Sequence, residues 1–295
     1  MTTIYLRPLN GLCNRMRTLA SGRALAAATG AQCVVFWDVN GDLGARYEDL
    51  FVPGDDGFRL INVAPWASVG QIAQIVLFGE TARIKGVPLG WVTRLALAGR
   101  IHRQVRPETF TPAELEALAR QSGRMLITSW WSFYGGTDVD FSFFRPHPAA
   151  QIEIEAISAR FNDSTIGVHI RRSDNANAIR YSPTSAFEGA MAQAIQADPR
   201  VSFFLTTDCP TTEATFAERF GKRVITRGRR ISRDSVEGMR DAVVDLFVLS
   251  RTRRIFGSYY STFSETAASL GRITWVTVTH DADLRCNSAV LVIPE

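Results

Sequence analysis

The feature that most restricts the fold is a regular alternation of segments in the second half of the chain. Short apolar runs typical of buried strands alternate there with longer runs of helical period. Because the connections are short, the series of strand–helix–strand units predicts a doubly wound parallel sheet. The expected strands cover residues 164–172, 201–208, 223–228, 254–258 and 274–279, and the expected helices cover 182–197, 211–221, 235–252 and 261–271.

The first half opens in the same way, and between residues 45 and 125 its pattern is less regular. A stretch with two prolines, FFRPHPAAQ, is the best candidate linker between the halves. We therefore expect an α/β protein of two Rossmann-like domains facing a cleft, with residues 1–150 in one and 151–295 in the other. The expected elements of the first half are strands at 3–9 and 32–38, a loop at 10–16, helices at 17–29 and 111–123, and a strand from residue 124 that enters an aromatic loop.

Composition narrows the function only broadly. The 295 residues are 46% hydrophobic and carry a net charge of +4, which suits anionic ligands and equally fits a solvated basic surface. The four cysteines show no metal-ligand spacing, so we expect reduced thiols in a cytoplasmic protein. No signal peptide or membrane-spanning run is expected. The arginines form no stripe interleaved with aromatics, which disfavours nucleic-acid binding.

One apolar run, in GVHIRRSD (167–174), carries a histidine and ends in two arginines and an aspartate. His169 lies two residues before Arg171 and therefore on the same face of the strand. Alternation sends Arg171 and Arg172 to opposite faces unless the chain bends, so one guanidinium fork suits a diphosphate while the other supports the loop or pairs with Asp174. Taken alone, the segment is equally consistent with a core histidine beside a surface Arg–Asp pair.

Small hydroxyl residues gather where the helix expected at 261–271 begins. Ser261, Thr262 and Ser264 follow a strand end in GSYYSTFS (257–264). Free backbone N–H groups and hydroxyls at a helix N-terminus make an anion site. Plain N-capping by Ser261 or Ser264 is the alternative.

An acidic residue, Asp245, lies within the apolar run AVVDLFVLS and would be costly to bury without a partner. A carboxylate can accept two adjacent donors of guanine, although pairing with a nearby arginine is the commoner situation. Asp208 ends another expected strand, FFLTTD, either at the ligand edge of the sheet or as a helix cap. The loop TRGRRISRDS (226–235) either closes over phosphates or is a solvated basic loop.

In the first half, Asn14 and Arg15 are expected near the tip of the loop in NGLCNRMR, and this loop could offer backbone amides and Asn14 to a phosphate or sugar across the cleft. The loop lacks the spacing of a dinucleotide fingerprint or a P-loop, and the chain has no nucleophile elbow. We expect no metal site, because Asp38, Asp42 and Asp138 are not arranged as a metal-binding acidic pair.

In this order, GVHIRRSD, FFLTTD, DLFVLSRTRRIFGSYYSTFSETAASLG and, more loosely, NGLCNRMR resemble the fucosyltransferase superfamily. That superfamily includes α1,6-fucosyltransferases, bacterial nodulation fucosyltransferases and protein O-fucosyltransferases. The resemblance covers about residues 165–280 and only the first loop of the first half. It implies a GT-B-like fold, GDP-fucose held by the second domain, an acceptor-side first domain, and an inverting transfer that needs no metal or other cofactor.

The resemblance also implies roles for individual residues. Arg171 would grip the β-phosphate and stabilise the leaving GDP, supported by Arg172. Asp174 is the acid available near this motif, since the loop SDNANAIRYSP lacks the glutamate that some relatives place there. The general base is therefore Asp174, a residue of the first domain, or absent. The other matches are His169 and Asp245 at guanine and ribose, Asp208 on the donor side, Ser261, Thr262, Phe263 and Ser264 as the phosphate-binding turn, and Asn14 close to the fucose.

The expected function is fucose transfer from GDP-fucose to a hydroxyl acceptor, which would be a glycan, a lipid-linked sugar or a small molecule. A transferase for another GDP-sugar and a non-catalytic nucleotide- or glycan-binding module are the alternatives. Trp130 and Trp131 in SWWSFYGG either stack on an acceptor sugar or, as we expect, fill an inter-domain core. The basic segment 82–106 either contacts a membrane peripherally or forms a solvated helix.

Overall fold

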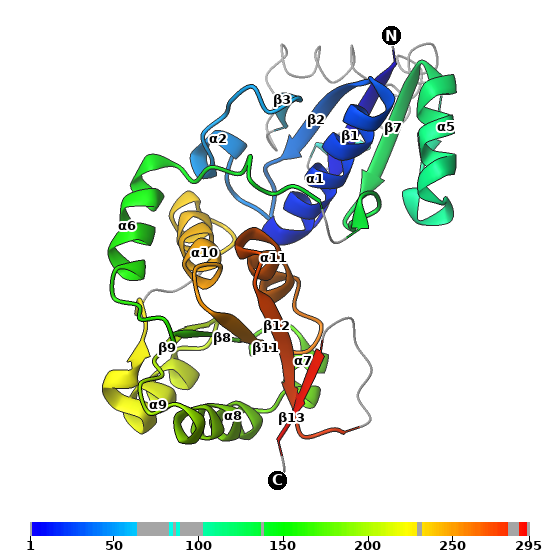
Figure 1. The fold of residues 1–295 in the computed structure, drawn as a ribbon. Helices are drawn as coiled ribbons and strands as arrows, with labels where there is room; N and C mark the ends of the chain where they lie inside the picture. The colour runs from blue at the N-terminus through cyan, green and yellow to red at the C-terminus, as the bar shows by residue number, and fades with distance from the viewer. Residues whose placement is uncertain are drawn as a thin grey trace. The chain divides into compact units, whose positions relative to one another are not determined.

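The computed structural model describes residues 2–63, 83–84, 87–88, 103–136, 139–228, 232–282 and 289–293. It consists of two compact units (Figure 1). The first comprises Met1–Arg145 with Arg233–Met239, and the second comprises Pro146–Ser232 with Arg240–Glu295. Within the described residues, no helix is both long and apolar enough to cross a bilayer. Most of the segment 82–106 lies outside the described residues.

The first unit contains a parallel sheet in the order β3-β2-β1-β7-β6. The chain leaves β1 toward β2 and β3 on one side, and later forms β6 and β7 on the other side. The switch in direction therefore falls between β1 and β7. The strands are β1 (Thr3–Pro8), β2 (Gln32–Asp38), β3 (Arg59–Val63), β6 (Arg103–Val105) and β7 (Arg124–Ser129), and a separate antiparallel pair joins β4 (Arg83–Ile84) to β5 (Val87–Pro88).

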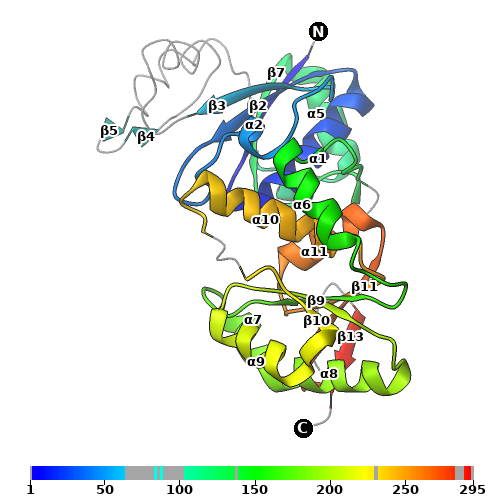
Figure 2. The same ribbon diagram turned by 90° about the vertical axis from the view of Figure 1, so that its left-hand side faces the viewer.

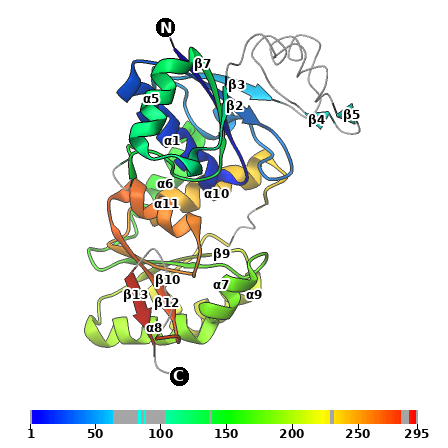
Figure 3. The same ribbon diagram turned by 90° about the vertical axis from the view of Figure 1, so that its right-hand side faces the viewer.

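Helices α1 (Leu12–Thr29) and α5 (Pro112–Ser122) pack on each other and against this sheet (Figure 3). The loop expected at residues 10–16 is wrong, because α1 already begins at Leu12. Leu12, Arg15 and Met16 are all buried, at the spacing of one helix face, so burial against the sheet extends the helix to the end of β1. The remaining elements of this unit are α2 (Tyr47–Leu50) and the 3₁₀ turn η1 (Pro107–Thr109).

The second unit contains a parallel sheet in the order β10-β9-β8-β11-β12-β13. This is the 3-2-1-4-5-6 order of a doubly wound sheet, with its switch point between β8 and β11. The strand β13 and the short helix α7 were not expected from the sequence. The strands are β8 (Ile166–Ile170), β9 (Phe203–Thr207), β10 (Val224–Ile225), β11 (Arg254–Gly257), β12 (Thr274–Thr279) and β13 (Ala289–Val292).

Helices cover both faces of this second sheet (Figure 2). Phe187 and Met191 of α8 and Phe216 of α9 join strand residues such as Val168 in one apolar core. The other face carries α10 and α11, and His169 points to it by strand alternation. The α/β fold of parallel sheets is thus confirmed. The helices are α6 (Pro148–Ser158), α7 (Ala176–Tyr181), α8 (Thr184–Ala197), α9 (Pro210–Phe220), η3 (Gly221–Arg223), α10 (Val236–Leu249) and α11 (Thr262–Gly271).

Candidate functional site

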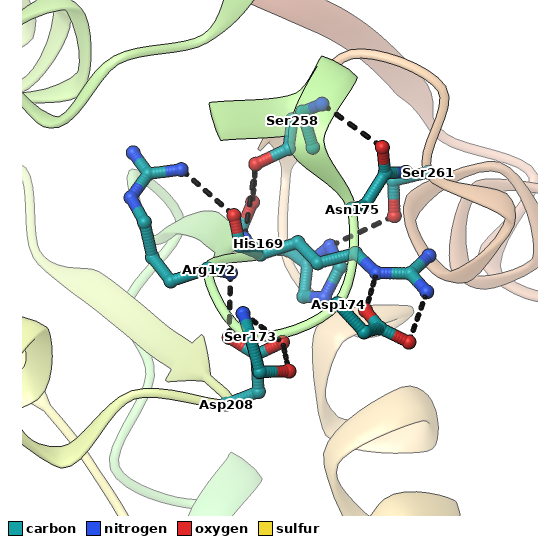
Figure 4. A network of polar contacts seen from close by, with 10 residues as sticks. His169, Arg172, Ser173, Asp174, Asn175, Asp208, Ser258 and Ser261 are labelled. Atoms are coloured by element: carbon teal, nitrogen blue, oxygen red, sulfur yellow. Dashed lines mark hydrogen bonds and ion pairs between the residues drawn. The ribbon is translucent and has the colours of Figure 1, made fainter. Parts of the chain in front are cut away.

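Most of the predicted site residues of the second unit gather at the carboxyl ends of the neighbouring strands β8, β9 and β11, where an open α/β sheet binds its ligands. Ser258 joins the two strand ends beyond their last ladder pair. Its backbone N–H donates to the His169 carbonyl at 3.2 Å, and its hydroxyl accepts from the Arg171 N–H at 3.0 Å (Figure 4). Sequence reasoning did not single out Ser258, because nothing local shows that it faces the neighbouring strand.

The His169 imidazole is buried and held on two sides. Its Nδ1 atom lies 3.0 Å from the Ser264 hydroxyl and 3.1 Å from the Ser261 hydroxyl. Its ring stacks on Phe263, with centroids 4.8 Å apart. Burial lowers the pKa of His169 to about 4, and the positive charges of Arg171 and Arg172 act in the same direction against Asp208. The imidazole is therefore neutral near pH 7.

The Arg171 guanidinium lies at the sheet edge and pairs with Asp174. Its Nε and Nη2 atoms donate to the two carboxylate oxygens at 2.7 and 2.8 Å. The side chains are 23% and 38% exposed, so this pair stands at the surface. Asp174 thus binds the two guanidinium N–H groups that were expected to bind a diphosphate, and it fixes the orientation of the Arg171 guanidinium.

The Arg172 side chain holds the loop together. Its guanidinium donates to the carbonyls of Arg171 at 2.8 Å and Ser182 at 2.9 Å. Asp208 secures the same loop from the end of β9, because its carboxylate accepts from the backbone N–H groups of Arg172 and Ser173 at 2.6 and 3.1 Å. It also accepts from the Ser173 hydroxyl at 2.6 Å (Figure 4). Arg172 and Asp208 therefore shape the loop that carries Arg171.

Helix α11 begins at this edge with Ser261 as its N-cap residue and Thr262 as its first residue. The Ser261 side chain makes no capping hydrogen bond, since its hydroxyl faces His169. Plain capping by Ser261 is therefore wrong. The first turn of α11 is left with backbone N–H groups that no Ser261 cap satisfies, which is the arrangement that binds anions.

Close packing brings Ser264 to His169. A Cβ added to Gly257 would lie 2.6 Å from the Ser264 hydroxyl, so β11 needs a glycine here. Just before α11, Tyr260 is 60% exposed and has φ +56, in the left-handed region that a tyrosine rarely adopts. Such strain is typical of loops that serve a ligand.

Asp245 belongs to a separate buried network on α10. One of its oxygens accepts from the Thr206 hydroxyl at 2.8 Å, and the other accepts from Arg227 at 2.8 Å. Arg227 also pairs with Glu153 at 2.9 Å and Asp241 at 2.7 Å. Burial raises the pKa of Asp245, and the Arg227 charge opposes that rise. Pairing of Asp245 with an arginine, the alternative to guanine binding in the sequence analysis, is therefore observed, and the partner is Arg227.

In the first unit, Asn14 lies in the first turn of α1 and not at a loop tip. Its side-chain oxygen accepts from Arg17 at 2.8 Å. The neighbouring Arg15 is fully buried and donates to the carbonyls of Asn10 and Asp38. Asn14, which the resemblance places close to the fucose, belongs to the first unit.

Two further features bear on ligands. Among the described residues, no group of three or more acidic, histidine or cysteine side chains is placed to hold a metal ion. A cavity of about 570 Å³ in the first unit is lined by residues such as Thr3, Gln32 and Arg124, which start their strands. This is the amino edge of the sheet, opposite the edge where such sheets bind ligands.

No family model and no curated protein matches the sequence. Solved structures do match in fold. NodZ α1,6-fucosyltransferase soaked with GDP-fucose has a TM-score of 0.59 and 18% identity, over 91% of this chain and 92% of that one. Arabidopsis thaliana FUT1 in complex with GDP has a TM-score of 0.57 and 12% identity, over 93% and 69%. POFUT1 in complex with GDP-fucose has a TM-score of 0.57 and 12% identity, over 91% and 94%. The chain therefore has the fold of these fucosyltransferases.

Proposed function

We propose that this protein is a glycosyltransferase that transfers fucose from GDP-fucose to a hydroxyl acceptor. One observation carries the proposal: His169, Arg171 and the N-terminus of α11 meet at the switch point of a doubly wound sheet. A nucleoside diphosphate suits these groups, because a guanidinium and free backbone N–H groups bind phosphate while a neutral imidazole contacts the nucleoside. NodZ and POFUT1, which share the fold, were studied with GDP-fucose.

In the proposed reaction, an oxygen of the acceptor attacks C1 of fucose from the side opposite the diphosphate. The bond between C1 and the β-phosphate oxygen breaks, and GDP leaves with the electron pair. Arg171 and the first turn of α11 stabilise the charge that develops on this phosphate. Thr262 and Phe263 help to form the phosphate-binding turn. The acceptor proton passes to a base, and the anomeric configuration inverts.

Asp174 has a positioning role in this proposal. Its bidentate pair with Arg171 aims the guanidinium, which limits its availability as a proton acceptor. The proton acceptor is then a group of the first unit or, where the departure of GDP drives the transfer, a water molecule that takes the proton from the acceptor hydroxyl. Asn14 is proposed to lie near the transferred sugar. Asp245 is proposed to read guanine, which requires its carboxylate to exchange the hydrogen bonds that it accepts from Thr206 and Arg227. No metal takes part in this mechanism, so EDTA is expected to leave the rate unchanged.

The decisive experiment compares nucleotide binding by the intact chain and two arginine variants. GDP and GDP-fucose should raise the melting temperature, and UDP-glucose should not. Arg171→Met should weaken GDP binding about a hundredfold, because it removes a charged partner of the diphosphate. Arg200→Met is the matched control, since the Arg200 side chain is 85% exposed. Equal GDP affinity in the wild type and Arg171→Met would overturn the proposal.

Binding alone does not separate a transferase from a nucleotide-binding module. Slow release of GDP from GDP-fucose without acceptor, lost in Arg171→Met, is expected only of the transferase. The same assay with GDP-mannose distinguishes fucose transfer from the use of another GDP-sugar.

A further inference from the structure

Two adjacent tryptophans of the aromatic loop that follows β7 stand exposed in the first unit. Trp130 is 38% exposed and Trp131 is 39% exposed. Their ring centroids lie 6.4 Å apart, with the planes tilted by 44°. Both directly follow β7, at the carboxyl end of the strand that flanks the switch point of the first sheet. Large apolar rings exposed side by side mark an interaction site, and this edge is where such sheets bind ligands.

The backbone of this aromatic loop is fixed by helix α1. The Trp130 carbonyl accepts from Arg17 Nε at 3.0 Å, and the Trp131 carbonyl accepts from the Thr18 hydroxyl at 3.3 Å. The Phe133 N–H donates to the Ser21 hydroxyl at 3.2 Å. A ligand that docks on these rings therefore meets a surface that is already ordered, which lowers the entropy cost of binding.

Arg17 connects the pair to the predicted transfer site. Its guanidinium carbon lies 4.9 Å from the centre of the Trp131 ring, and its Nη2 atom donates to the Asn14 side chain at 2.8 Å. The cation covers part of one side of the indole, while more than a third of the Trp131 surface stays exposed. The rings thus lie one side chain away from the residue proposed to approach the transferred sugar.

We propose that Trp130 and Trp131 form a carbohydrate-binding surface that receives a sugar ring of the acceptor. The apolar C–H face of a pyranose stacks on an indole while its hydroxyls remain in water or bond to neighbouring polar groups. The backbone that carries the two rings is held by partly buried hydrogen bonds from Arg17 and Thr18, and the exposed Ser132 flanks the rings. These features suit a polar ligand with a defined shape better than a lipid surface. Only the identification of the sugar as the acceptor rests on the proposed function.

The test measures binding of the full chain to a printed glycan array, followed by titration with the free form of the glycan that binds best. Trp130→Ala and Trp131→Ala should each weaken this binding roughly tenfold. Trp131→Phe should restore part of the affinity, and Trp131→Leu should not, because a ring face is needed. Ile152→Ala is the matched control, since Ile152 is 70% exposed on α6. GDP affinity should stay unchanged in every variant, which also shows that they fold.

Three outcomes would overturn the inference: no glycan binding by the wild type, glycan affinity retained within twofold by both alanine variants, or equal affinity in Trp131→Leu and Trp131→Phe. Binding to phosphatidylcholine–phosphatidylglycerol vesicles that both alanine variants lose would assign the rings to a membrane and would also overturn it. Failure of the proposed function appears separately, as absence of GDP binding by the wild type.

Discussion

In each unit an arginine lies shortly after the first strand of the sheet, and the two arginines differ in burial and in hydrogen-bond partners. Arg15 follows β1, is fully buried, and donates to the backbone carbonyls of Asn10 and Asp38. Arg171 follows β8, is 23% exposed, and pairs with a surface acid. Backbone carbonyls bind the Arg15 guanidinium, whereas the Arg171 guanidinium lies where a ligand can reach it. The partners of an arginine, more than its place after a strand, decide whether it serves stability or binding.

The strongest test of this contrast is Arg15→Met. Removing the guanidinium leaves buried carbonyl oxygens without a donor, so we expect a loss of about 3–5 kcal/mol in the stability of the first unit. Amide hydrogen exchange in β1 and β2 measures this loss for that unit alone, which matters because a chain of two units need not unfold in one step. Protection in β8 and β11 should stay unchanged. Unchanged exchange in β1 would show that Arg15 contributes little to the fold.

A pH titration tests the buried imidazole of the second unit. The pKa of His169 is about 4 when folded, against about 6.5 when unfolded, so the unfolded chain binds the proton first as the pH falls. His169 should therefore cost on the order of 3 kcal/mol of stability between pH 6.5 and pH 4. Amide hydrogen exchange in β8, compared at pH 6.5 and pH 4, measures this loss of stability. The His169→Gln variant should show a flatter dependence, and an equal slope in both proteins would contradict the assignment.

A smaller effect is expected for Asp208→Asn. The carboxylate accepts three hydrogen bonds from Arg172 and Ser173, and an amide has one oxygen for them. We expect a loss of about 1–2 kcal/mol and weaker GDP binding, because the loop that carries Arg171 loses its anchor. Exchange rates of the Arg172 and Ser173 amides report the loss directly. Rates equal to those of the wild type would show that Asp208 does not hold the loop.

The smallest change in stability is expected for Arg171→Met. A pair that is partly exposed contributes less than about 1 kcal/mol, so melting should shift little even though GDP binding falls strongly. Asp174→Asn serves as its partner variant and should also melt close to the wild type. If Arg171→Met lost as much stability as Arg15→Met, the two arginines would not differ in their contribution to the fold.

The sequence predicted most of the second unit because strand and helix periods there are clear. It missed α7, whose six residues are too few to show a period, and it missed the edge strand β13. It also placed the start of α1 too late, since the polar residues Asn14 and Arg15 look like a loop until the burial of Arg15 is known.

The site was predicted less completely, because its contacts depend on packing between distant segments. The order of motifs brought His169 and Ser261 to one edge, as the hydrogen bond between them shows. Nothing in the sequence indicated that Ser258 would join β8 to β11. The sequence suggested an arginine partner for Asp245 but did not identify it as Arg227. The exposure of Trp130 could not be predicted either, because an aromatic run is as typical of a core as of a binding surface.

The close approach of Gly257 to Ser264 has a consequence for sequence variation. A side chain at position 257 fits only if position 264 loses its own, because the added Cβ would also lie 2.8 Å from the Ser264 Cβ. Gly257→Ala should therefore be tolerated better together with Ser264→Gly than alone. Related sequences are expected to change positions 257 and 264 together. A relative with a large side chain at both positions must hold the residue equivalent to His169 by other contacts.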